Sequence, residues 1–224
     1  MKKVIFILAI FCLASTTYAQ VSLIPKAGIT ISNVAFDDDD KWDGQKSVLG
    51  FTGGLGINFA LTDDQFLSLQ PELLYTQKGF AAKKSGTVDY DGVYKLNYLE
   101  LPVMLKIGFG GDVLRGYVNL GPSVGYLLNG RVKGTWDVAD IISDDIDEAI
   151  KFKSDATDGD ITELNANRVE IGANFGAGIG VNIGSSALFL DARYNAGLTD
   201  FDKDRKSRNQ PFYITAGLKI PLSQ

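Results

Sequence analysis

Apolar and polar residues alternate strictly along the segment 97–109 of this chain, which reads NYLELPVMLKIGF. Leucine, valine and isoleucine take every second position, and tyrosine, glutamate, proline, methionine and lysine fill the positions between them. Side chains on a β-strand point to opposite faces in turn. This period of two therefore predicts a strand with two unlike faces.

The same alternation occurs seven more times, so the sequence predicts eight strands, at about 22–32, 48–61, 65–79, 93–109, 113–129, 168–183, 187–198 and 211–222. Long connections at 33–46, 80–92, 130–167 and 199–210 alternate with tight turns at 62–64, 110–112 and 184–186. Up-and-down strands place all the long connections at one end and all the short turns at the other. This asymmetry and the even strand number are typical of bacterial outer-membrane barrels, whose short turns face the periplasm.

Alternation alone does not separate a membrane barrel from a soluble one of the lipocalin kind, so the composition of the polar face decides. A face exposed to water is normally rich in lysine and glutamate. Here the polar face of segment 168–183 consists mainly of glycine and asparagine, and that of segment 48–61 of glycine, threonine and asparagine. Small residues of this kind suit a narrow interior. The predicted fold is therefore an all-β, eight-stranded antiparallel up-and-down transmembrane β-barrel, with lipid outside, a small polar lumen inside and four long extracellular loops.

The first 19 residues have the pattern of a secretory signal peptide. Lys2 and Lys3 precede an apolar run at 4–14, and small residues occupy the expected cleavage positions before Gln20. The apolar run is shorter than the roughly 20 residues that a membrane-spanning helix needs. We expect a signal peptide at 1–19 and a single barrel domain at 20–224, integral to the cell outer membrane.

Charge and composition exclude several classes of function. The chain has 22 basic and 27 acidic residues and a net charge of −5, and loss of Lys2 and Lys3 would make it more negative, which argues against nucleic acid as a partner. It contains no histidine, which excludes histidine-dependent catalysis and most zinc sites. The single cysteine is Cys12, so the segment after the signal peptide has neither a disulfide nor a thiol nucleophile.

Two acidic segments raise the question of calcium, which prefers oxygen ligands. The first holds four consecutive aspartates at 37–40 and Asp43, and the second holds three aspartates and a glutamate within 155–163. The spacing of the second segment does not match an EF-hand, and solvated acidic loops are the favoured interpretation of both. We predict no metal, no cofactor and no catalytic residue, and we interpret Glu72 and Glu100 as structural ion-pair partners rather than an acid–base pair.

The third connection carries the pattern of a short amphipathic helix. Ser143 is a suitable N-cap, Asp144 and Asp145 favour the positive end of a helix dipole, and lysines at 151 and 153 favour the negative end. Isoleucines at 142, 146 and 150 recur every four residues and would form one apolar stripe. Such a helix would either cover the barrel mouth or be presented to a partner.

The stretches 69–75 (LQPELLY) and 97–102 (NYLELP), supported by Gly121-Pro122 and by 192–194 (ARY) and 197–199 (GLT), resemble the PorT-like family of outer-membrane β-barrel proteins. The resemblance spans the chain after the signal peptide. It implies an outer-membrane location and an eight-stranded fold. The family takes its name from a protein needed for secretion across the outer membrane, and the matching motifs are those of barrel architecture.

Three functions stay open at this point. The first is a non-enzymatic membrane protein with a plugged lumen that acts through its extracellular loops in binding or in envelope structure. The second is an accessory component of a secretion or envelope-assembly complex, and the third is a narrow solute channel. The partners we expect are outer-membrane lipid and lipopolysaccharide, the outer-membrane assembly machinery and an extracellular or envelope protein, with the barrel itself a monomer.

The lumen of an eight-stranded barrel leaves just enough room for side chains to fill it. Inward positions carry charges of both signs: Lys26, Lys106, Arg115, Arg193 and Lys219 against Glu72, Glu100, Glu170 and Asp191. Glu72 and Glu100 lie on neighbouring strands near mid-height and would repel each other unless a cation lies between them. We therefore predict a structural ion network of Glu72, Glu100, Lys106, Arg115, Asp191 and Arg193, in which Arg193, Lys106 or Arg115 bridges the two glutamates.

Overall fold

Eight long antiparallel strands close into a barrel in the computed structural model, which describes residues 20–36, 46–84, 88–138, 142–153, 163–201 and 207–222. Each strand pairs with the next in the ring, β1 pairs with β13, and the pairing of β6 with β10 joins the two halves. The strands of the ring are β1 (Val21–Ser32), β3 (Lys46–Ala60), β4 (Leu67–Lys84), β5 (Val88–Gly110), β6 (Leu114–Val138), β10 (Val169–Ile183), β11 (Ser186–Gly197) and β13 (Phe212–Pro221). The prediction of an all-β, eight-stranded antiparallel barrel is confirmed.

The predicted alternation separates an apolar outside from a polar inside on these strands. On β10, Phe175 and Ile179 are 54% and 53% exposed, whereas Glu170 and Asn174 are buried. The same contrast runs around the ring, with leucine, isoleucine, valine and aromatic side chains outward. Such a continuous apolar belt is suited to lipid rather than to water. Across the described residues, no helix is long and apolar enough to cross a membrane.

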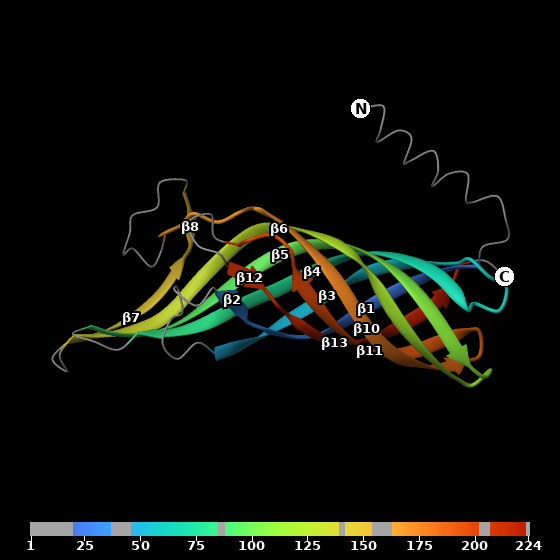
Figure 1. Cartoon of the computed structure of the whole chain (residues 1–224). Coiled ribbons are helices and arrows are strands. Elements are labelled where there is room, and N and C mark those ends of the chain that lie inside the picture. The colour runs from blue at the N-terminus through green and yellow to red at the C-terminus, as the bar shows by residue number, and fades with distance from the viewer. Residues whose placement is uncertain are drawn as a thin grey trace, which may run out of the picture.

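Three tight connections lie at one end of the barrel, which we call the short-turn end. Gly110 and Gly184 take positive φ values of 124° and 63°, a conformation that favours glycine. In the turn between β3 and β4, hydrogen bonds from Thr62 and Phe66 hold the pKa of Asp64 below its usual range. The backbone of Val21 accepts a hydrogen bond from Leu222, so both ends of the described chain lie at this end (Figure 1).

Three strands continue well beyond the length that a bilayer needs. A tilted transmembrane strand needs about 9–11 residues, but β4, β5 and β6 have 18, 23 and 25 residues. The outer parts of these strands and a further strand, β7 (Ile142–Ala149), form one sheet that projects past the barrel (Figure 1). We call it the extension sheet. The prediction that 80–92 is a loop is wrong, because β4 and β5 pair from Lys78↔Leu96 outward to Lys84↔Tyr90.

The predicted helix around 142–153 is also wrong, since this segment forms β7 and the short strand β8 (Lys151–Phe152). A spacing of four residues is a multiple of two, so the isoleucines at 142, 146 and 150 fit one face of a strand as well as a helix stripe. A helix of this length is marginal by itself. Pairing with β6, from Val138↔Ile142 to Arg131↔Ala149, satisfies the backbone of this segment instead.

The long connections cover the other end of the barrel with a hydrophobic cluster. Two short strands from the first and last connections, β2 (Val34–Phe36) and β12 (Ser207–Asn209), pair with each other, and β8 pairs with β9 (Glu163–Leu164). Phe80 and Tyr94 stack beneath them with ring centroids 4.9 Å apart. The mouth cluster, as we call it, comprises Val34, Phe80, Tyr94, Leu96, Tyr98, Leu127, Val132, Ile150, Ala166 and Phe201.

Several expectations concern segments outside the described residues. These are the signal peptide at 1–19, the acidic run 37–43, and the acidic positions within 155–162. In the described part of the chain, no group of three or more acidic residues, histidines and cysteines has the arrangement of a metal site.

Candidate functional site

The inward face of the barrel carries a buried ion cluster built around Arg193. The guanidinium of Arg193 binds both carboxylate oxygens of Glu72, with Nη1–Oε2 and Nη2–Oε1 distances of 2.8 and 2.9 Å. Its Nε lies 2.5 Å from Oδ1 of Asp191, and Nζ of Lys26 lies 2.6 Å from Oε2 of Glu72. All four side chains are at least nine-tenths buried. We call these residues the arginine cluster; its two positive and two negative charges balance.

Amide side chains complete the arginine cluster. Gln70 donates to Oε1 of Glu72 at 2.5 Å, and Asn119 donates to Oδ2 of Asp191 at 2.9 Å. A fully buried ion pair gains stability only when its remaining polar atoms are also hydrogen-bonded. The donors on β4 and β6 therefore meet this condition for one oxygen of each carboxylate, whereas Oδ1 of Asp191 and Nε of Arg193 are in ion-pair contact without a hydrogen bond.

Glycine on the inward face of β10 makes room for the cluster. A Cβ added to Gly176 would lie 2.6 Å from Cγ of Arg193, and one added to Gly178 would lie 2.3 Å from the Tyr117 ring. Real Cβ atoms do not approach other atoms so closely. At positions 176 and 178 of β10, glycine is therefore explained by the side chains opposite and by the backbone oxygens of Ala192 and Leu190.

A second buried ion cluster lies nearer the mouth and contains one cation and two carboxylates. Nζ of Lys78 is 2.6 Å from Oε1 of Glu100 and 2.5 Å from Oε1 of Glu170. The lysine is on β4, and the two carboxylates come from β5 and β10. We call these three residues the lysine cluster; it carries one net negative charge.

Neutral hydrogen-bond donors from the last connection and the last strand reach the lysine cluster. Asn209 of β12 donates to Glu170 at 2.5 Å and to the Tyr98 hydroxyl at 3.3 Å. The Tyr213 hydroxyl donates to Glu100 at 3.3 Å. The polar interior is thus joined directly to the connections that cover the mouth.

The structure brings together three of the six predicted network residues: Glu72, Asp191 and Arg193. Glu100 is not bridged to Glu72, because its cation is Lys78. Lys106 and Arg115 belong to neither cluster: Lys106 donates to Gln70 at 3.2 Å, and Arg115 donates to the backbone oxygen of Asp64 at 2.8 Å.

Lys78 is the main residue that sequence reasoning left out of the network. The signal was present, because Lys78 lies an even number of positions from Glu72 on β4 and so shares its inward face. Which carboxylates lie level with Lys78 depends on the register of β4, β5 and β10, and the alternation of residues within a strand does not reveal this register.

Little space is left between the two clusters. A cavity of about 10 Å³ lies between them, lined by Lys26, Glu100, Arg193 and Tyr213 among other residues. That is about the space of one water molecule. Between the arginine cluster and the lysine cluster, the described residues therefore leave room for about one water molecule.

Comparison with protein families agrees with this geometry. Residues 17–203 match the family described as outer membrane protein beta-barrel domain. The chain belongs to this family. Members of the family are integral to the outer membrane, so the apolar belt faces lipid and the predicted location is confirmed. No curated protein matches the chain.

The chain is similar to several solved structures of outer-membrane and surface proteins at low sequence identity. The outer membrane protein OprG from Pseudomonas aeruginosa is 11% identical, with a TM-score of 0.51, and the match covers 92% of this chain and 97% of that one. Neisserial surface protein A is 13% identical, with a TM-score of 0.46 and coverage of 90% and 99%. Ail, the attachment invasion locus protein of Yersinia pestis, is 18% identical, with a TM-score of 0.41 and coverage of 90% and 99%. At these identities the likeness to OprG shows the fold alone.

Proposed function

We propose that this outer-membrane barrel is a non-enzymatic binding protein with a plugged lumen, which presents the extension sheet to a protein partner outside the cell. The observation that supports this proposal most strongly is the contrast between the lumen and the extension sheet. The middle of the lumen is occupied by paired charges, whereas β4–β7 form a sheet beyond the length needed to span a bilayer. Ordering so many residues costs conformational entropy, which favours a role for the surface they create.

The surface of the extension sheet is charged and held by its own ion pairs. Asp147 of β7 pairs with Arg131 and, at 2.9 Å, with Lys133 of β6. Both basic residues hold the pKa of Asp147 below its usual range. Strand β7 forms the free edge of the sheet and has the sequence ISDDIDEA. Acidic residues on an edge strand discourage pairing with other sheets, so this surface fits a partner that contributes basic side chains rather than another strand.

The orientation follows from the family architecture, in which short turns face the periplasm. The only cysteine lies at position 12, so single-cysteine variants report topology cleanly. We expect Glu148→Cys, on the exposed part of β7, to react with a membrane-impermeant maleimide on intact cells. Gly111→Cys, where an added Cβ meets no atom within 4 Å, should react only after the outer membrane is opened. The reverse labelling pattern would contradict this orientation.

A shortened hairpin tests the binding proposal. Thr135 and Asp145 face each other in the β6–β7 pairing, so a Gly-Gly turn can join them and remove 136–144 without disturbing the barrel. Cross-linking from Glu148→Cys on intact cells should yield one defined adduct, and the shortened chain should lose it. A difference in SDS-gel mobility between unboiled and boiled samples, as large as in the unmodified protein, would show that the barrel of the shortened chain is folded. An undiminished adduct would contradict a role for this hairpin in binding.

A second candidate is an accessory role in a secretion or envelope-assembly complex of the PorT type. The stretches that support the resemblance, 69–75 and 97–102, contribute Glu72 and Glu100 to the two ion clusters. They also contribute Gln70, which donates to Glu72, and Tyr98, whose hydroxyl accepts from Asn209. The motif thus specifies interior architecture and leaves the activity open. Co-purification of a stable envelope complex in mild detergent, unaffected by the shortened hairpin, would favour this candidate.

The third candidate, a narrow solute channel, makes a separate prediction. Because the two ion clusters and the mouth cluster fill the interior, we expect no steady conductance in planar bilayers. The matched comparison is the double variant Glu72→Ala with Arg193→Ala, which removes a balanced pair of charges and should raise the frequency of channel openings. Long-lived openings in the unmodified protein would contradict a plugged lumen.

A further inference from the structure

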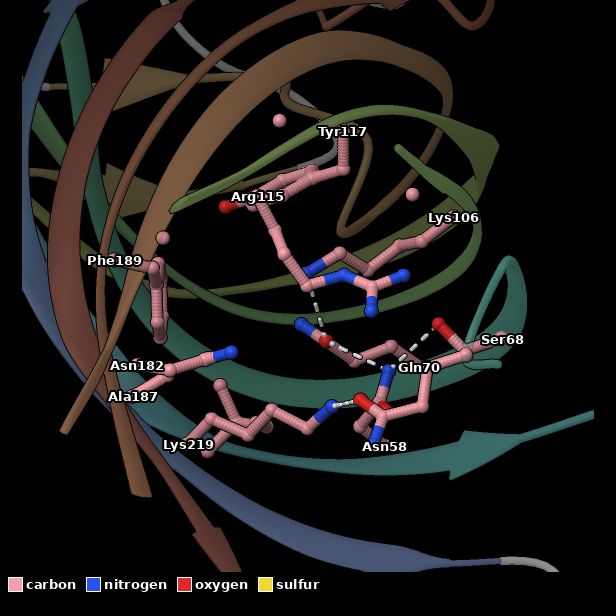
Figure 2. A pocket seen from close by; sticks show the side chains of 15 residues that line it. Asn58, Ser68, Gln70, Lys106, Arg115, Tyr117, Asn182, Ala187, Phe189 and Lys219 are labelled. Atoms are coloured by element: carbon pink, nitrogen blue, oxygen red, sulfur yellow. Dashed lines mark hydrogen bonds between the residues drawn. The ribbon is translucent and has the colours of Figure 1, made fainter. Parts of the chain in front are cut away.

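A cavity opens at the short-turn end of the barrel, next to Gln70, which also donates to Glu72 of the arginine cluster. Figure 2 shows side chains that line it. Its volume is about 80 Å³, enough for a few water molecules or one small ion. The residues around it come from all eight strands of the ring. Those with polar side chains that define its chemistry are Asn58, Gln70, Lys106, Arg115, Asn182 and Lys219.

Three of these residues are cations, and the described residues that line the cavity include no carboxylate. Lys106, Arg115 and Lys219 form no salt bridge with any residue that the structure describes. Each instead donates to a neutral oxygen: Lys106 to Gln70 at 3.2 Å, Arg115 to the backbone of Asp64 at 2.8 Å, and Lys219 to Gln65 at 2.5 Å. Lys106 also lies 3.8 Å from the centre of the Tyr117 ring, which favours a cation there.

Two carboxylates are close enough to attract these cations, Asp191 for Lys106 and Asp64 for Arg115, but each is bound to other groups. Asp191 is bound by Arg193 and Asn119, and the carboxylate of Asp64 accepts the backbone N–H of Phe66 at 3.0 Å. This differs from the rest of the interior, where every buried cation of the two clusters has a carboxylate within 2.9 Å. Three half-buried positive charges around one small space repel one another, and an anion between them would remove that repulsion.

We propose that this cavity binds a small multivalent oxyanion of the phosphate class, which enters from the short-turn side. The guanidinium of Arg115 offers a planar fork suited to oxyanions. Each lysine ammonium has three N–H donors, and among the described residues a single oxygen accepts from each of them. The arginine cluster closes the inner end, so the site is a blind pocket rather than part of a pathway. The phosphate group can belong to a free ion or to a lipid headgroup of the adjacent leaflet.

The test uses the full barrel, isotope-labelled and purified in maltoside micelles without phosphate or sulfate. The side-chain amide signals of Asn58 and Asn182 line the cavity and report occupancy by NMR. Added sodium phosphate, against a constant sodium chloride background, should shift both signals saturably. Lys106→Met and Lys219→Met should each weaken binding roughly tenfold, the usual order for loss of one charge-assisted hydrogen bond. Lys151→Met on β8, an exposed lysine at the opposite end, should leave the affinity unchanged.

The two lysine variants lie on different strands, so the test remains possible if one of them does not fold. The change in SDS-gel mobility on boiling identifies folded protein. Nanodiscs of phosphatidylglycerol in phosphate-free buffer form the second arm. Shifts of the same amide signals there assign the ligand to a lipid headgroup, and shifts only with sodium phosphate assign it to a free ion; either supports the proposal. Absence of saturable shifts in both arms, or equal affinities in the wild type and in both lysine variants, would overturn it.

Discussion

Replacement of Arg193 by alanine is expected to lower the free energy of unfolding by about 3–5 kcal/mol, the usual cost of removing one partner from a buried ion pair. Arg193 binds Glu72 through two nitrogens and Asp191 through a third. Its loss leaves two buried carboxylates with only Lys26 to neutralise them. Urea unfolding in lipid vesicles, followed by tryptophan fluorescence, measures the effect.

Arg208→Ala is the matched control, because the same residue type is exposed there. Arg208 pairs with Asp200 at 3.3 Å, and their side chains are 52% and 35% exposed. Exposed pairs contribute about 0–1 kcal/mol. Arg193→Lys should lie between the two alanine variants, since an ammonium keeps the charge but loses the two-nitrogen contact with Glu72. Equal stabilities of Arg193→Ala and Arg208→Ala would show that the arginine cluster contributes little.

Lys78→Met should have an effect of similar size, about 3–5 kcal/mol, because it removes the only cation of the lysine cluster. Glu100 and Glu170 both bind this ammonium, at 2.6 and 2.5 Å, and without it two carboxylates face each other in a buried site. Methionine preserves most of the side-chain volume, so the loss reports charge rather than a cavity. The same unfolding assay applies, with Lys83→Met in the exposed extension sheet as the control.

A second substitution separates charge repulsion from misfolding. Glu170→Gln in the Lys78→Met background removes one of the two opposing charges and should recover part of the lost stability. Asn209 still finds an oxygen on glutamine, so its hydrogen bond need not be lost. If the double variant is no more stable than Lys78→Met, repulsion between the carboxylates is not the cause.

The sequence predicts the eight strands of the ring well because both faces of each strand are constrained: the outward face must be apolar, and the inward face must fit a narrow polar lumen. Each residue of β10 either faces lipid or faces a crowded lumen, so the alternation of Phe175 and Ile179 with Glu170 and Asn174 is unambiguous. Beyond the membrane, the outward side chains no longer face lipid and need not be apolar. Polar residues become acceptable on both faces of β4 and β5 past Lys78 and Leu96, and a strand then looks like a loop in the sequence.

The sequence predicts that buried ion pairs fill part of the lumen, but it does not predict which residues pair with which. Inward charges of both signs must pair in a small lumen, and this places Glu72, Asp191 and Arg193 together. Which cation meets Glu100 depends on the stagger of β4, β5 and β10. The irregular register of β5 with β6 between Asn97 and Tyr98 shows that this stagger is not uniform. Local alternation contains no information about it.

The ion clusters also set an order of events in folding. Arg193 and Glu72 are 121 positions apart in the chain, and Lys78 and Glu170 are 92 apart. These pairs join strands on opposite sides of the lumen, so we expect them to form late in folding, when the ring closes. Interactions that are absent from the transition state for folding slow unfolding without speeding folding. The paired charges should therefore lower the unfolding rate, so that an inserted barrel stays closed for long periods.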